Sequence, residues 1–141
     1  MTISARNQLQ ATVKSIKKGA TNDVIELSLA AGETLVAVIT SESTANLGLQ
    51  IGSPAIAIFK APAVILSTDN ELILSSRNQL KGTVQQIIDG AVNAEVIVKT
   101  NAGTELTAII TETSLKRLGL KIGSEVTALI KASNVILGVK R

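Results

Sequence analysis

The chain repeats itself at a spacing of 71 residues, and this repeat limits the folds it can adopt more than any other feature. The letters RNQL stand at residues 6–9 and again at 77–80, and the two halves align without a gap. A unit of about 65 to 70 residues is longer than the periods of common solenoids. We therefore expect two tandem copies of one small domain, residues 1–68 and 69–141, joined by the polar segment STDNE.

Each copy has the pattern of short strands. In the first copy NQLQATVKSI alternates apolar and polar residues, and DVIELSLA and ETLVAVIT flank a glycine, as in a hairpin. TSESTANLGL then predicts a short helix capped by Thr40 or Ser41 and ended by Gly48, and SPAIAIFKA and AVILS follow the helix as two more strands. The second copy keeps this order. We expect an all-β fold with one short helix per unit, as tandem five-stranded barrels of the OB (oligonucleotide/oligosaccharide-binding) type.

The apolar residues are small and aliphatic. Hydrophobic residues make up 45% of the chain, yet Phe59 is its only aromatic residue. Such side chains build thin, tightly packed cores, and a domain this small buries little surface by itself. Apolar residues therefore remain for an interface, and we expect the chain to self-associate.

The sequence contains no cysteine and no histidine. This excludes metal sites built from thiolate or imidazole, and nucleophilic sites that need a histidine base. The acids Asp23, Glu26, Glu33 and Glu42 have no acidic counterparts in the second copy, so no repeated carboxylate pair is available for acid–base chemistry. We expect a protein that is not an enzyme.

The formal net charge of +3 suits small anions better than a nucleic-acid duplex, which requires a dense basic surface. No apolar run reaches the roughly 18 residues of a membrane-spanning helix, and no basic-then-apolar signal segment opens the chain. We expect a cytoplasmic protein without membrane or nucleic-acid partners.

Several polar residues recur in both copies, although a repeat kept for folding alone would let polar residues drift. Two clusters stand out: Ser-x-Arg-Asn before the first strand, and Lys-Ala-x between the last two strands. They offer hydroxyl, amide and backbone N–H donors with positive charge and no carboxylate, which is the chemistry of an oxyanion site.

Plainer explanations exist for the same residues. Arg6 and Lys60 could be solvated charges and Asn7 a turn former. A recent duplication would also retain them, but Lys14-Ser15 has become Gln85-Gln86, so the copies have had time to diverge. Among the other repeated polar residues, turn formation suits Asn22 and Asn93, helix capping suits Thr40, Ser43, Thr111 and Ser114, and Gln8 and Gln79 have no clear role.

The two copies resemble molbindin domains, the small molybdate- and tungstate-binding Mop units. The resemblance rests on SARNQLQATV and KAPAVIL in the first copy and on SSRNQLKGTV and KASNVIL in the second, and it covers essentially the whole chain. It implies an OB-like barrel for each unit and a homotrimer of two-domain chains. It also implies a function in the cytoplasmic storage and homeostasis of molybdate or tungstate, bound reversibly as ligand without a cofactor.

The resemblance also implies two classes of oxyanion site. The first lies between adjoining domains or subunits and uses the two clusters, and the second lies near the threefold axis, at the turns 19–22 and 90–93. Pro62 stands where the second copy has Ser133, and it removes both an N–H and a hydroxyl from first-copy sites. The first class comprises Ser4, Ala5, Arg6, Asn7, Lys60, Ala61, Pro62, Ser75, Ser76, Arg77, Asn78, Lys131, Ala132 and Ser133, and the second comprises Gly19, Ala20, Asn22, Gly90, Ala91 and Asn93.

Two other functions compete with this one. An OB protein that binds single-stranded nucleic acid stacks bases on aromatic residues, and one phenylalanine gives it little to stack on. A molybdate-sensing regulatory module would have to act on a separate partner, because the two copies fill the chain and leave no room for a helix-turn-helix domain.

Overall fold

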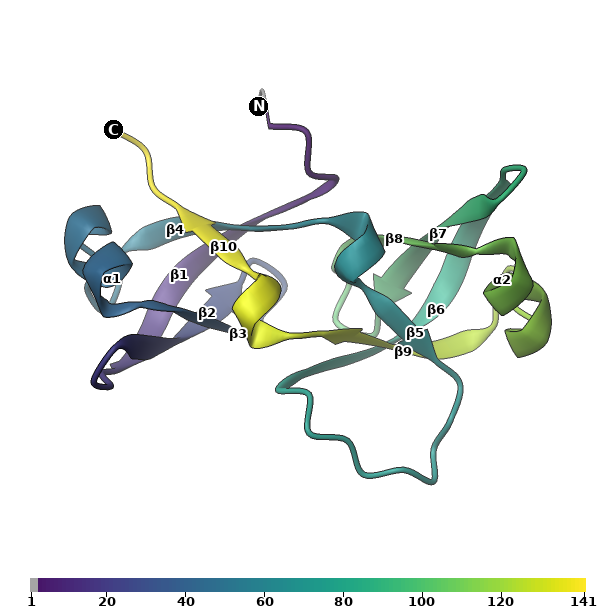
Figure 1. Cartoon of the computed structure of the whole chain (residues 1–141), viewed down its shortest axis with the longest axis horizontal. Helices are drawn as coiled ribbons and strands as arrows, with labels where there is room; N and C mark the ends of the chain where they lie inside the picture. Colours follow the sequence, from purple (N-terminus) through teal and green to yellow (C-terminus); the bar gives the residue numbers. More distant parts are fainter. Residues whose placement is uncertain (1–2) are drawn as a thin grey trace. The chain divides into compact units, whose positions relative to one another are not determined.

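The computed structural model describes residues 3–141, which form two compact units that are each built on one five-stranded antiparallel sheet (Figure 1). Each unit also carries one α-helix and one 3-10 turn, so the expected all-β fold with one short helix per copy is confirmed. Unit 1 contains β1 (Asn7–Lys17), β2 (Asn22–Leu29), β3 (Thr34–Thr40), α1 (Ser41–Leu47), β4 (Pro54–Phe59), η2 (Ala132–Asn134) and β10 (Ile136–Gly138). Unit 2 contains η1 (Ala61–Ala63), β5 (Ile65–Ser67), β6 (Asn78–Asp89), β7 (Asn93–Thr100), β8 (Glu105–Thr111), α2 (Glu112–Leu118) and β9 (Glu125–Ile130).

The two compact units do not coincide with the two sequence repeats. Among the described residues, unit 1 comprises residues 3–59 and 131–141, and unit 2 comprises residues 60–130. The last strand of each repeat pairs with the fourth strand of the other repeat: β10 lies on β4, and β5 lies on β9. The expected boundary between residues 68 and 69 follows the repeat in sequence, whereas the sheets exchange their last strands across it.

The exchange has a simple physical reason. β5 and β10 carry nearly the same letters, ILS and ILG, and β4 and β9 present the same pattern of buried residues, so either strand suits either partner. The patterns of the sequence therefore predict that a fifth strand exists but not which sheet receives it. The strand expected over 63–67 is also shorter, because residues 61–63 form the 3-10 turn η1.

The core of each unit lies on the concave side of its curled sheet. Val13, Leu27 and Leu35 are almost fully buried in unit 1, as are Val84 and Leu106 in unit 2. In unit 1, β10 lies near β3 at the opposite edge of the sheet, and η2 packs on β3; in unit 2, β5 and η1 make the same contacts with β8. The exchanged segments thus close each sheet toward a barrel.

The short helices begin and end as the sequence predicts. Thr40 is the N-cap of α1, and its side chain accepts a hydrogen bond from the N–H of Ser43 at 3.1 Å. Gly48 ends the helix with a φ of 63°, in the left-handed region that glycine adopts without steric cost. Thr111 and Gly119 repeat this arrangement around α2.

The strand exchange predicts where a mutation in β10 acts. Leu137 is 6% exposed in unit 1, so Leu137→Ala should destabilise that unit by about 2 to 3 kcal/mol. Hydrogen exchange measured by mass spectrometry should then become faster in peptides that cover β4 and remain unchanged in peptides that cover β9. Leu66→Ala, the matched change in β5, should speed hydrogen exchange in β9 and leave β4 unchanged. Faster hydrogen exchange in β9 alone for Leu137→Ala, or in β4 alone for Leu66→Ala, would contradict the strand pairing.

Candidate functional site

The two Ser-x-Arg-Asn segments lie where the chain enters the first strand of each repeat. Arg6 and Arg77 are exposed, while Asn7 and Asn78 begin β1 and β6 and are 3% and 2% exposed. The Asn78 side-chain amide donates to the carbonyl of Ile130 at 3.1 Å. A buried amide that is bonded to the main chain has a structural reason to be retained, so the recurrence of asparagine is not by itself a sign of ligand binding.

Gln8 and Gln79, for which the sequence suggested no role, hold these segments in place. Gln8 Nε2 donates to the carbonyls of Ile3 and Ala5 at 2.9 and 2.8 Å. Gln79 Nε2 donates to the carbonyls of Leu74 and Ser76 at 3.0 and 2.9 Å. Each glutamine thus fixes the backbone on both sides of the cluster's serine, and its recurrence in both copies was the signal for this role.

The Lys-Ala-x clusters follow the ends of β4 and β9. Lys60 and Lys131 are exposed, whereas Ala61 and Ala132 are buried in the 3-10 turns η1 and η2. Strand register places Asn7 opposite Phe59 and Asn78 opposite Ile130, the residues that precede the two lysines. In each repeat the arginine–asparagine end of one strand therefore adjoins the strand end that leads into the lysine.

In the second copy this arrangement has an additional hydrogen bond. The Ser76 hydroxyl donates to the carbonyl of Asn78 at 3.1 Å and also lies 3.5 Å from the carbonyl of Ile130. Alanine occupies the corresponding position, Ala5, in the first copy and has no hydroxyl. The two copies of the cluster thus differ at this position as well as at Pro62 and Ser133.

Each unit contains a cavity in which other repeated polar residues meet. Cavity 1, in unit 1, has a volume of about 440 Å³, and its polar lining is Asn22, Thr40, Ser43, Asn46 and Ser133. Cavity 2, in unit 2, has a volume of about 470 Å³, and the corresponding residues are Asn93, Thr111, Ser114, Arg117 and Pro62. Apolar residues of the third strand, the helix and the exchanged last strand complete both linings.

These cavities contain four of the predicted site residues and not the others. Asn22 and Ser133 line cavity 1, and Asn93 and Pro62 line cavity 2. For Thr40, Ser43 and their counterparts the sequence predicts helix capping alone. They do cap the helices, but they also face the cavities, and their recurrence in both copies was again the available signal.

The predicted turn at residues 19–22 is fastened by a carboxylate. Asp23 is 1% exposed; its Oδ1 accepts from the hydroxyl of Ser41 at 2.7 Å and from the N–H of Gly19 at 3.2 Å. Hydrogen bonds from Ser41, then from Thr44 and Gly19, together with nearby Lys18, hold the pKa of Asp23 below its ordinary value against the opposing effect of burial.

The second turn is fastened differently. Ala94 replaces Asp23, and Glu112, which stands in the place of Ser41, accepts from the N–H of Gly90 at a longer 3.4 Å. At Gly19 and Gly90 an added Cβ would collide with the carbonyl oxygen of Asn22 or Asn93. Both glycines therefore have a steric reason to be retained, whatever else the turns do.

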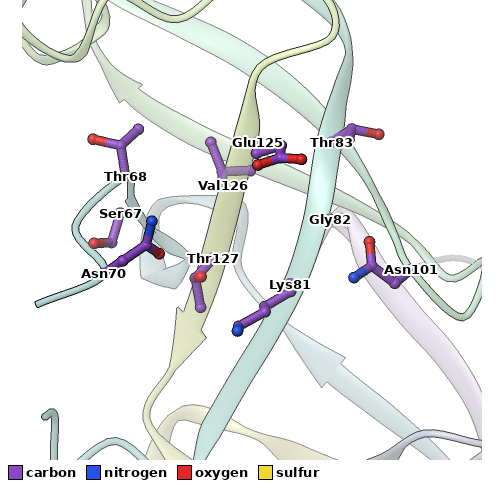
Figure 2. A pocket seen from close by; sticks show the side chains of 10 residues that line it. All are labelled: Ser67, Thr68, Asn70, Lys81, Gly82, Thr83, Asn101, Glu125, Val126 and Thr127. Carbon is purple, nitrogen blue, oxygen red and sulfur yellow. The ribbon is translucent and has the colours of Figure 1, made fainter.

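Unit 2 has a further, polar pocket of about 300 Å³ between β6, β9 and the segment that follows β5 (Figure 2). Its lining includes Lys81, Asn101, Glu125 and Thr127, and none of the residues predicted for oxyanion binding. The corresponding surface of unit 1 is lined by Gln10, Pro54, Ile56 and Val139 among others, so the polar character belongs to one copy. Within residues 3–141 no group of three or more carboxylate, imidazole or thiol side chains could hold a metal ion, and no helix is long and apolar enough to span a membrane.

The pKa of Asp23 predicts how stability changes with pH. Because the folded pKa lies below the unfolded value of about 3.9, ionised Asp23 stabilises the fold above that pH, and the contribution is lost as the pH falls through the folded pKa. Asp23→Asn should therefore lower the melting temperature at pH 7, and its effect should diminish as the pH falls below about 3.9. Asp89→Asn, at an exposed acid, serves as the control, and an equal effect of Asp23→Asn at every pH would show that the charge is not involved.

Both repeats match one known domain family, and a solved structure matches nearly the whole chain. The model of the TOBE domain matches residues 3–66 and again 74–137. A solved structure of the cytoplasmic molybdate-binding protein ModG, with molybdate bound, superposes with a TM-score of 0.95 and is 48% identical, covering 99% of this chain and 100% of that one.

Longer relatives match as well. The molybdenum-pterin-binding protein MopA of Rhodobacter capsulatus is 41% identical over 99% of this chain and 53% of that protein. The DNA-binding transcriptional dual regulator ModE of Escherichia coli (strain K12) is 33% identical over 95% of this chain and 51% of that protein. The chain thus spans about half the length of these two relatives. On the match to both repeats, the chain belongs to the TOBE domain family and carries two tandem copies of that domain.

Proposed function

We propose that this chain binds molybdate reversibly, and tungstate in the same sites. The observation that carries the proposal is the likeness over the full chain to ModG, whose structure holds molybdate, at 48% identity. The chemistry of the repeated clusters supports it independently, because they combine hydroxyls, main-chain N–H groups and cations without a carboxylate. Molybdate is a tetrahedral dianion, and such a donor set suits it.

We assign the first class of site, which lies between adjoining domains or subunits, to the residues of the two clusters in each copy. Their cations are Arg6 and Lys60 in the first copy and Arg77 and Lys131 in the second, all of them exposed. Pro62 contributes no donor where Ser133 contributes a hydroxyl, so sites built with the first-copy cluster bind with fewer hydrogen bonds. The turns of Gly19, Ala20 and Asn22 and of Gly90, Ala91 and Asn93 are proposed as the second class of site.

Binding by such groups favours selection by size. Donors that the fold already holds in position need little reorganisation when the anion enters, and their spacing suits one radius of oxyanion better than another. The glutamine bonds to the main chain around Ser4 and Ser75 supply part of that fixed geometry.

We further propose that the chain self-associates as a homotrimer, as the resemblance to molbindins implies. Several large apolar side chains support an interface, since Ile65 and Ile136 at the exchanged strands are 54% and 61% exposed, and Ile51 and Ile122 are 74% and 70% exposed. An anion that binds between subunits would stabilise the assembly, because it binds the assembled form in preference to separate chains.

The role that fits these properties is storage and homeostasis of molybdate in the cytoplasm, without catalysis. ModG is described as cytoplasmic. The single aromatic residue, Phe59, is 1% exposed and so offers no surface on which a base could stack. This disfavours the alternative function of binding single-stranded nucleic acid. A sensing module that acts on a partner is the second candidate, favoured by the similarity to the regulator ModE.

The proposal predicts tight molybdate binding that depends on the cluster arginines. Isothermal titration calorimetry of the full chain should show micromolar or tighter binding, and molybdate should raise the melting temperature. The double variant Arg6→Ala with Arg77→Ala should weaken binding about tenfold or more, since it removes charge-assisted hydrogen bonds.

The control for this experiment is Lys99→Ala with Lys121→Ala, which removes the same charge from exposed positions outside both the clusters and the proposed turns. Its affinity for molybdate should stay within about twofold of the unaltered chain, because exposed charges at a distance are largely screened. Absence of heat and of thermal stabilisation with molybdate and with tungstate would refute the proposed function.

A further inference from the structure

Cavities 1 and 2 are two versions of one site. Every residue that lines cavity 1 has its repeat counterpart in the lining of cavity 2. The polar groups differ at two positions: Asn46 and Ser133 line cavity 1, and Arg117 and Pro62 take their places in cavity 2. The two cavities therefore differ in side-chain chemistry and not in the elements that form them.

The polar lining of cavity 1 carries no charged side chain. The hydroxyl of Thr40 donates to the hydroxyl oxygen of Ser43 at 2.8 Å, and this pair is held against the first turn of α1 by the capping bond of Thr40. Ser133 and Asn46 are exposed and add a hydroxyl and an amide. An anion in cavity 1 would be held by neutral, directed hydrogen bonds.

Cavity 2 keeps the hydroxyl pair and the asparagine, and changes the other two polar positions. Thr111 donates to Ser114 at 2.9 Å, as in cavity 1. Pro62 offers neither a hydroxyl nor an N–H, so both donors of the serine are lost. Arg117, in the last turn of α2, is exposed and lines the cavity, where it brings a positive charge and a planar fork of N–H donors.

We propose that Arg117 is the specificity-determining residue of cavity 2. It compensates for the missing serine, so cavity 2 binds a tetrahedral oxyanion by charge, whereas cavity 1 binds it by neutral hydrogen bonds. This inference rests on the proposed function, since both cavities take the same class of ligand. A guanidinium attracts sulfate or phosphate as well as molybdate, and salt screens that attraction. Cavity 2 is therefore the more salt-sensitive and the less selective of the two.

The test exchanges the side chains of the two cavities. Arg117→Asn gives cavity 2 the residue of cavity 1, and Lys116→Asn is the matched control, because Lys116 is an exposed cation in the same helical turn that does not line the cavity. Molybdate is titrated into each full-length variant by calorimetry at about 50 mM and about 500 mM NaCl, where screening is weak and strong respectively. At low salt Arg117→Asn should weaken one set of sites about fivefold or more, and Lys116→Asn should leave all sites within about twofold of the unaltered chain. At high salt the difference between the two variants should disappear.

The reciprocal variant, Asn46→Arg with Ser133→Pro, should make the sites of cavity 1 as salt-sensitive as those of cavity 2, and it keeps the test decisive where Arg117→Asn does not fold. Sulfate should compete with molybdate more strongly in this variant than in the unaltered chain. Identical titrations of Arg117→Asn and Lys116→Asn, or a reciprocal variant with unchanged salt dependence, would overturn the role of Arg117 while leaving molybdate binding intact. An unaltered chain that takes up no molybdate would instead overturn the proposed function itself.

Discussion

The pairing of each repeat's last strand with the fourth strand of the other repeat is the contact on which the rest of the structure depends. Val64 and Leu66 are buried in unit 2, and Val135 and Leu137 are buried in unit 1, so each core is completed by residues from the other copy. The same exchange decides which Lys-Ala-x segment reaches which unit. Ser133 of the second repeat lines a cavity of unit 1, and Pro62 of the first repeat lines the equivalent cavity of unit 2. Strand exchange thus combines chemistry from both repeats in each unit.

The duplication also lets each copy serve as an internal control for the other. Where both copies keep a polar residue, the structure often supplies a reason: Gln8 and Gln79 bond the main chain, and Thr40 and Thr111 cap a helix. Where the copies differ, the fold still forms, so the difference is free to serve a function. The polar pocket of unit 2 and the arginine of cavity 2 are both differences of this kind.

Much of this fold could be predicted from the sequence, because hydrophobic alternation, capping residues and glycines act locally. The helix limits at Thr40 and Gly48 follow from side-chain and backbone preferences within one turn. The destination of the fifth strand could not be predicted, since two equivalent partners compete for it. For the same reason the sequence could not predict that Ser133 lines one cavity with Thr40 and Ser43, because this placement depends on that long-range pairing. The recurrence of the glutamines and capping residues was visible, but their partners are main-chain carbonyls and cavity surfaces that no spacing rule identifies.

The proposed function requires that donor-rich, carboxylate-free segments of this chain hold a tetrahedral oxyanion. The measurement that tests it most directly is the crystal structure of the full chain with tungstate, whose tungsten atoms are located by anomalous scattering. The proposed function predicts tungsten beside the Ser-x-Arg-Asn segments at Ser4–Asn7 and Ser75–Asn78, the Lys-Ala-x segments that follow β4 and β9, or the turns at residues 19–22 and 90–93. The oxygens of the anion should lie within hydrogen-bonding distance of donors in those segments. Tungsten found only elsewhere, such as the polar pocket around Lys81 and Asn101, or no ordered tungsten at saturating concentration, would contradict it.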